Sequence, residues 1–221
     1  PARNVPPLMP TSPRDTPGLP PLALYVHVPW CVRKCPYCDF NSHAQQGELP
    51  EADYVAAMLE DLDQDIGYVS DRAIQSVFIG GGTPSLFSAD AYRQLFDGLR
   101  QRLCFADEAE ITLEANPGTL EQGRFAAYRE LGINRLSIGV QSFDPLHLQQ
   151  LGRIHSGDDA RRAIASAREA GFDNFNVDLM HGLSGQQRVD ALRDLDMAID
   201  SGASHISWYQ LTIEPNTEFY R

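Results

Sequence analysis

The chain has 221 residues, enough for one substantial core, and its 43% hydrophobic and 22% charged residues are typical of a globular protein. Its net charge of −12 argues against nucleic acid as a partner, because such binding depends on cations paired to phosphates. The apolar runs are too short for a transmembrane segment, no signal-peptide pattern is present, and free thiols fit a reducing compartment, so we expect a cytoplasmic protein.

The first 21 residues contain eight prolines among small and polar residues. This composition predicts a flexible tail over residues 1–21, followed by one core domain over residues 22–221. Part of the negative charge lies in an acidic stretch between Glu48 and Asp71. We interpret this stretch as a solvated helix face, and a docking site for a basic partner is the alternative.

From Leu22 onward, short β-rich runs alternate with amphipathic stretches of helical length. The predicted strands are Ala23–Val28, Ile74–Ile79, Glu110–Glu114, Arg135–Ile138, Asn174–Asp178 and His205–Tyr209. The predicted helices are Glu51–Gly67, Ala89–Arg102, Glu121–Glu130, Asp158–Ala170 and Gln186–Ser201. Cap residues support these boundaries: Ser88, Thr119 and Ser156 before helices, and Gly132 and Gly171 after them.

This alternation predicts an α/β protein with a parallel sheet and right-handed crossovers. The pattern alone allows either a doubly wound sheet or a (βα) barrel. A complete eightfold barrel usually needs about 250 residues, so six units in this chain would form only part of one.

Three cysteines, Cys31, Cys35 and Cys38, follow the first predicted strand with C-x3-C-x2-C spacing. Three thiolates can bind three irons of a [4Fe–4S] cluster and leave the fourth iron open. A structural zinc site completed by His27 or His43 is one alternative, and a disulfide with a leftover thiol is another. We expect Cys104, outside this group, to be a small buried hydrophobic residue.

Polar or glycine residues follow every predicted strand, where parallel sheets collect their ligand-binding groups. Each has a plainer interpretation as a turn glycine, a core carboxylate or a residue that ties loops together. A guanidinium at Arg153 could bind a ligand carboxylate through two hydrogen bonds. The strand-end candidates are Gly81, Gly82, Thr83, Glu114, Gln141 and Asp178.

Six segments resemble the oxygen-independent coproporphyrinogen III oxidase family of the radical S-adenosylmethionine (SAM) superfamily, in matching order: 25–41, 80–85, 113–117, 135–143, 151–155 and 178–180. The resemblance implies a TIM-like partial (βα)6 barrel over residues 22–221, without the C-terminal domain of the family. It also implies a [4Fe–4S] cluster on the three cysteines, with SAM chelating the fourth iron. The SAM-contact positions implied by the family are Tyr25, Tyr37, Gly81, Gly82, Thr83, Glu114, Gln141, Arg153 and Asp178.

Phe40 stands where the oxidases of this family have a fourth cysteine, in C-x3-C-x2-C-x-C. This variant resembles a heme-chaperone branch, whose members bind heme and pass it to acceptor proteins such as respiratory enzymes. Propionate decarboxylation in porphyrin biosynthesis, by 5′-deoxyadenosyl radical chemistry, is the alternative, so enzymatic activity stays open.

Both functions imply an electron donor for the cluster, and peripheral contact with a membrane stays open. No heme ligand is assigned, because the family's heme-ligand region is expected in the C-terminal domain. The histidines considered for this role are His27, His43, His155 and His181.

Overall fold

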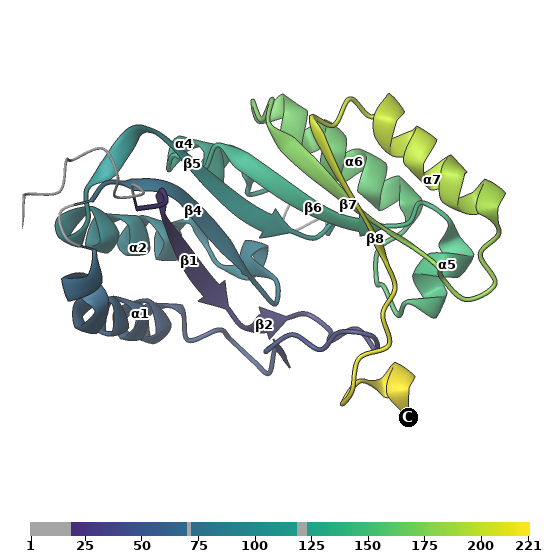
Figure 1. Cartoon of the computed structure of the whole chain (residues 1–221), viewed down its shortest axis with the longest axis horizontal. Helices are drawn as coiled ribbons and strands as arrows, with labels where there is room; N and C mark the ends of the chain where they lie inside the picture. The colour runs from purple at the N-terminus through teal and green to yellow at the C-terminus, as the bar shows by residue number, and fades with distance from the viewer. Residues whose placement is uncertain (1–18, 70–71, 119–122) are drawn as a thin grey trace, which may run out of the picture.

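The computed structural model describes residues 19–69, 72–118 and 123–221. Its main element is a parallel sheet of six strands that lie side by side in chain order (Figure 1). The strands are β1 (Leu22–Val28), β4 (Ile74–Gly81), β5 (Phe105–Ala115), β6 (Arg135–Gln141), β7 (Phe175–His181) and β8 (His205–Gln210). Because the strand order never reverses, a doubly wound sheet is ruled out and the predicted partial (βα)6 barrel is confirmed.

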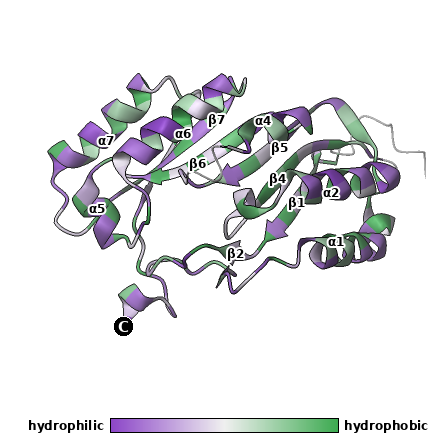
Figure 2. Ribbon diagram, turned by 180° about the vertical axis from the view of Figure 1, so that it is seen from behind, coloured by the Kyte–Doolittle hydropathy of each residue, from purple (hydrophilic) through white to green (hydrophobic). Residues whose placement is uncertain are grey.

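Helices alternate with these strands, and α2 and α6 lie on the same side of the sheet (Figures 1 and 2). The α-helices are α1 (Glu51–Asp65), α2 (Ala89–Arg102), α4 (Phe125–Glu130), α5 (Pro145–Gln150), α6 (Gly157–Glu169) and α7 (Arg188–Asp200). Short 3₁₀ turns are η1 (Ile66–Tyr68), η2 (Pro84–Leu86) and η3 (Glu218–Tyr220). Within the described ranges, no helix combines the length and apolar content needed to cross a membrane.

The two faces of the sheet differ in character because side chains alternate along each strand. The helix-facing side carries fully buried aliphatic residues such as Ile79, Leu113 and Ile138. On the opposite face, Ser137 and Asp178 belong to a polar network, with a 2.9 Å hydrogen bond from the serine hydroxyl to the carboxylate. The apolar side therefore forms the core, and the polar side lines the interior of the partial barrel.

A two-stranded parallel ribbon stands apart from the main sheet, formed by β2 (Trp30–Cys31) and β3 (His43–Ala44). It closes the loop that carries the three cysteines. The ribbon lies just beyond the carboxyl end of β1, and the cysteine loop continues from it toward the C-terminal segment, where Phe219 N donates to Pro36 O at 3.2 Å (Figure 1). The cysteine loop is therefore held at the end of the barrel where ligand-binding residues were predicted.

Several predicted boundaries are confirmed by capping contacts. The Ser88 hydroxyl accepts a hydrogen bond from Ala91 N at 3.1 Å, and Ser156 forms a capping box with Asp159. Gly132 and Gly171 follow α4 and α6 with positive φ angles of 100° and 84°. The acidic carboxylates of α1 are mostly exposed, as expected for a solvated face.

Other predictions differ from the structure. Strand β5 starts at Phe105 instead of Glu110, and α5 was not predicted. Cys104 is exposed instead of buried, because the neighbouring Leu103 takes the buried position at the end of α2. Residues 1–18 of the tail predicted over residues 1–21, the Thr119 cap and the start of the helix predicted from Glu121 lie outside the described residues.

Candidate functional site

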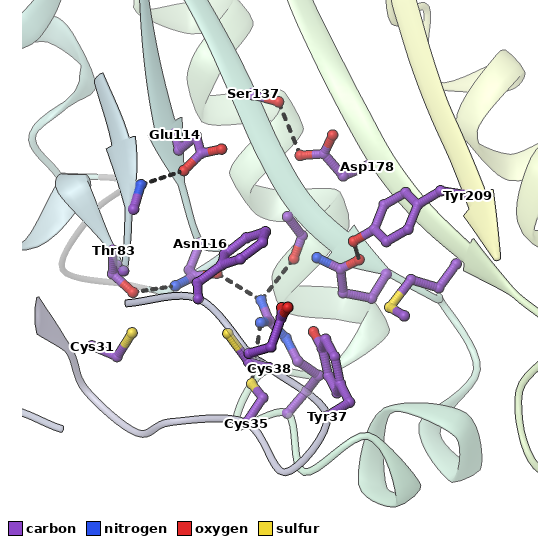
Figure 3. A pocket seen from close by; sticks show the side chains of 18 of the residues that line it. Cys31, Cys35, Tyr37, Cys38, Thr83, Glu114, Asn116, Ser137, Asp178 and Tyr209 are labelled. Carbon is purple, nitrogen blue, oxygen red and sulfur yellow. Dashed lines mark hydrogen bonds between the residues drawn. The ribbon is translucent and has the colours of Figure 1, made fainter. Parts of the chain in front are cut away.

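A cavity of about 450 Å³ opens at the carboxyl ends of the strands (Figure 3). This volume lies within the range of small-molecule pockets, about 300–1,000 Å³. It brings together most of the residues that were predicted from strand ends and cysteine spacing. The predicted residues that line it are Cys31, Cys35, Tyr37, Cys38, Gly81, Gly82, Thr83, Glu114, Gln141, Arg153 and Asp178.

Tyr25 is the exception among the predicted contacts. Its side chain is 57% exposed, its hydroxyl hydrogen-bonds His27 Nδ1 at 2.9 Å, and its ring stacks on Phe78. It does not line the cavity. Its assignment to a cofactor contact stays a prediction.

The cysteine loop is folded back on itself by backbone and lysine contacts. Cys38 N donates to Cys35 O at 3.1 Å, and Lys34 Nζ donates to the carbonyl oxygens of Phe40 and Ser42, each at 3.0 Å. All three thiols are free and line the same cavity. Among the described residues, no three His, Cys, Asp or Glu side chains are close enough together to hold a metal ion. The thiols therefore share a cavity without forming a closed metal site.

The glycine run after β4 packs against the start of this loop. Gly82 N donates to Val28 O at 2.8 Å, and a Cβ at Gly82 would lie 2.6 Å from Trp30 O. Gly81 has φ +120°, a conformation that favours glycine, and a Cβ there would lie 2.9 Å from Val28 O. Side chains at these positions would push the cysteine loop away from the sheet.

Two carboxylates approach each other on the inner face. Burial, opposed by a 3.1 Å hydrogen bond from Gly81 N and reinforced by the nearby charge of Asp178, raises the pKa of Glu114 to about 7. Burial also raises the pKa of Asp178, against the opposing effect of the Ser137 hydroxyl. A cationic ligand group would favour the ionised form of both, so the cavity is suited to positive charge at this point.

Arg153 lines the same cavity and contacts the cysteine loop. Its Nη2 donates to Asn116 Oδ1 at 2.6 Å and to Gly139 O at 2.8 Å, and its Nη1 donates to Cys35 Sγ at 3.5 Å. Its Nε is buried without a hydrogen-bond partner, and no described carboxylate forms an ion pair with it. A buried guanidinium in this state is prepared to bind a ligand anion.

Gln141 closes the cavity from the end of β6 in a strained conformation. Its φ is 68°, which non-glycine residues rarely adopt, and strain of this kind clusters at functional sites. The Tyr209 hydroxyl from β8 donates to Gln141 Oε1 at 2.7 Å, and burial raises the pKa of both Tyr209 and Tyr37. Contacts from another strand therefore fix the orientation of the Gln141 amide.

Among the lining residues that the sequence did not assign to the site, Asn116 and Tyr209 make hydrogen bonds that connect its parts. Both stand at the ends of predicted strands, which is the signal that could have assigned them. Asn116 Nδ2 donates to Thr83 Oγ1 at 2.9 Å, which joins the ends of β5 and β4. That contact spans 33 positions of sequence and is visible only in the fold.

None of the four histidines considered as heme ligands lines the cavity. His27 uses both ring nitrogens, on the Tyr25 hydroxyl and on Asn41 O. The other three have other surroundings. His155 is buried, with Nε2 3.0 Å from Val140 O, and the His181 ring packs on Trp208. His43 is exposed in β3. Burial, with the nearby Arg153 charge, lowers the pKa of His155 to about 4. This arrangement gives no support to a zinc site completed by His27.

The structure is a partial parallel barrel with three cysteines after its first strand and charged groups at the ends of the following strands. These features define a cofactor-binding core. The radical SAM superfamily model matches residues 25–198, and the chain belongs to this superfamily.

Named relatives agree with this assignment. The chain is 58% identical over 201 residues to the heme chaperone HemW of Escherichia coli K12, covering 91% of this chain and 53% of the relative. It is 36% identical over 197 residues to HemW of Bacillus subtilis 168, covering 89% and 52%. Coproporphyrinogen III oxidase (HemN) of Escherichia coli matches with a TM-score of 0.81 and 28% identity, over 90% of this chain and 46% of that structure. The chain thus spans about half the length of these relatives.

Proposed function

We propose that this chain is the radical SAM core of a heme chaperone that binds heme and transfers it to acceptor proteins. The observation that carries the proposal is the single cavity shared by three free thiols, an arginine with an unpartnered nitrogen and two buried carboxylates. Free thiols and a cluster fit a reducing cytoplasm, which is the location we propose.

The three cysteines would hold a [4Fe–4S] cluster. Cysteine thiolates are the usual protein ligands of such clusters, and this cavity offers three of them with no disulfide among the described cysteines. When bound, a reduced cluster of this kind supplies an electron to the sulfonium of SAM. The role of the loop is to hold the thiols at the barrel end and shield them from solvent.

The charges of the cavity complement SAM, which carries a carboxylate, an ammonium and a sulfonium group. Arg153 supplies the cation for the carboxylate through its unpartnered Nε. Glu114 and Asp178 supply negative charge for the cationic groups, at the cost that burial imposes on their ionised forms. Gln141 and Tyr37 line the same space, which supports their predicted role as SAM contacts.

Phe40 separates this chain from the oxidases. It lines the cavity where their extended motif places a fourth cysteine, and its side chain is 60% exposed. A phenylalanine offers no ligand for iron and no thiol chemistry, so heme handling is favoured over propionate decarboxylation. The heme-chaperone name of the curated relatives points the same way. Heme, an electron donor and heme-acceptor proteins such as respiratory enzymes are the partners this function requires.

The test is heme transfer by the full-length protein with its cluster reconstituted under anaerobic conditions. We expect the protein to bind heme and to restore the heme spectrum of a heme-free acceptor enzyme. Coproporphyrinogen III with SAM and reductant should give no protoporphyrinogen. Decarboxylation by this preparation would establish the oxidase instead, and absence of both activities from cluster-loaded protein would refute the proposal.

A further inference from the structure

Ser42 follows the cysteine loop and has no role in the function described so far. Its side chain is 1% exposed, and its Oγ lies 3.9 Å from Cys38 Sγ, within hydrogen-bond range for sulfur. A buried hydroxyl beside a cysteine sulfur can act as a donor to that sulfur.

The hydrogen-bond partners of Phe40 show where the Ser42 proton is directed. Phe40 O is the competing acceptor, 3.4 Å from Ser42 Oγ. That carbonyl already accepts from Lys34 Nζ at 3.0 Å and from Ser42 N at 2.7 Å. Both of its lone pairs are therefore used, and a thiolate is the stronger acceptor because the bond is charge-assisted. The hydroxyl proton is left for the cysteine sulfur.

Thr83 provides a second buried hydroxyl, which we compare with Cys31 in the same way as Ser42 with Cys38. Its side chain is 3% exposed, and its oxygen accepts a 2.9 Å hydrogen bond from Asn116 Nδ2. The Asn116 amide is itself oriented by Arg153, which donates to its oxygen at 2.6 Å. Thr83 N donates to Trp30 O at 2.7 Å, which holds Thr83 beside the start of the cysteine loop, and both Thr83 and Cys31 line the cavity. Because Thr83 Oγ1 accepts from Asn116, its single proton is free for the Cys31 sulfur.

We propose that each cysteine of the loop has its own hydrogen-bond donor, and that these donors raise the reduction potential of the bound cluster. Ser42 Oγ lies 3.9 Å from Cys38 Sγ, and Arg153 Nη1 donates to Cys35 Sγ at 3.5 Å. Thr83, whose backbone N donates to Trp30 O at 2.7 Å, is the donor that we assign to Cys31. Reduction adds negative charge that spreads onto the sulfurs, so a donor stabilises the reduced cluster more than the oxidised one. Ser42 and Thr83 are positioning and tuning residues in this scheme, and Asn116 orients Thr83. The inference rests on the proposed cluster site.

The experiment is a redox titration, followed by electron paramagnetic resonance, of full-length protein with reconstituted cluster and without SAM. Loss of one charge-assisted donor in Ser42→Ala should change the one-electron equilibrium by about tenfold, a shift of about 59 mV to more negative potential. Ser42→Thr, which keeps the hydroxyl, should restore the wild-type potential. Ser166→Ala, on α6 and away from the loop, is the matched control and should leave the potential unchanged.

Iron and sulfide content separate failure of this inference from failure of the cluster assignment. Wild-type protein that takes up no cluster would refute the proposed function itself. A fully loaded Ser42→Ala protein with the wild-type potential would overturn the tuning role of Ser42. If that variant does not retain its cluster, Thr83→Val decides, because valine keeps the shape and removes the donor. A wild-type potential in loaded Thr83→Val would then refute the inference.

Discussion

Glu114 gives a prediction that depends on the protein alone and needs no cofactor. Its carboxyl lies among buried groups, where desolvation disfavours the ionised form, and its pKa rises from 4.5 to about 7. Glu114→Gln removes the ionisable group and keeps an oxygen that can accept the hydrogen bond from Gly81 N. The substitution therefore isolates the electrostatic cost of burying this carboxylate.

The magnitude follows from the two pKa values. The native state binds the proton more tightly, so the stability provided by the protonated group is complete below pH 4.5 and is lost as the pH rises through about 7. A tenfold change in proton affinity corresponds to about 1.4 kcal/mol. The rise in the pKa of Glu114 from 4.5 to about 7 therefore lowers the stability of the wild-type protein by about 3 kcal/mol at pH 8 and by less than about 1 kcal/mol at pH 5. We expect Glu114→Gln to be more stable than wild type by about these amounts at the two pH values.

The stability difference between Glu114→Gln and wild type is measured by urea unfolding of the apo protein. The experiment is done under reducing and oxygen-free conditions at about pH 5, 6.5 and 8. Glu108→Gln, at an exposed position on the same strand, is the control for removing a carboxylate from β5. The reasoning fails if the advantage of Glu114→Gln is the same at pH 5 and pH 8. An advantage of wild type that grows with pH would reverse the sign of the argument.

Three further substitutions test the site and its support. Cys35→Ala should abolish cluster binding, seen as loss of iron and visible absorbance, whereas Cys104→Ala, at an exposed thiol, should retain both. Arg153→Ala should weaken SAM binding by about 1.5–3 kcal/mol, roughly 10- to 150-fold in Kd, as measured by calorimetry. The control is Arg161→Ala, and equal SAM affinities of the two variants would show that Arg153 is purely structural. Asp194→Ala leaves two buried donors of the turn after β6 unpartnered and should cost about 2–5 kcal/mol in urea unfolding; a loss below about 0.5 kcal/mol would contradict this.

The positions of the strands along the chain were predictable because buried parallel strands have a strong local signature, whereas their order in the sheet was not, because the pattern allowed both a doubly wound sheet and a barrel. Ile74–Ile79 lies inside β4, and Asn174–Asp178 begins one residue before β7. The start of β5 was missed because its first residues, from Phe105, include acidic side chains that weaken the strand signal. Helix α5 was missed although Asp144 before Pro145 is a capping signal, with Asp144 Oδ1 accepting from Leu146 N at 2.8 Å.

The candidate site was predictable to the extent that it follows from the parallel sheet. Residues at strand ends were brought into one cavity, as expected for Glu114, Gln141 and Asp178. Tyr25, on the edge strand β1, lies outside the cavity, and its hydroxyl and ring contact His27 and Phe78. The link from Arg153 to Asn116 spans 37 positions, and no local pattern encodes a contact of that range.

Arg153 joins the two halves of the site, and this has a consequence for how its variants are interpreted. One edge of its guanidinium contacts Cys35, a second contact orients Asn116 toward Thr83, and Nε is left for a ligand anion. The ligand carboxylate would use Nε and Cys35 uses Nη1 of the same rigid guanidinium plane, so a shift of that plane toward the ligand also changes the contact with Cys35. Ligand binding and the cluster potential are then linked, and the linkage must be equal in both directions. Arg153→Ala should therefore change SAM affinity and cluster potential together, whereas Ser42→Ala should change the potential alone.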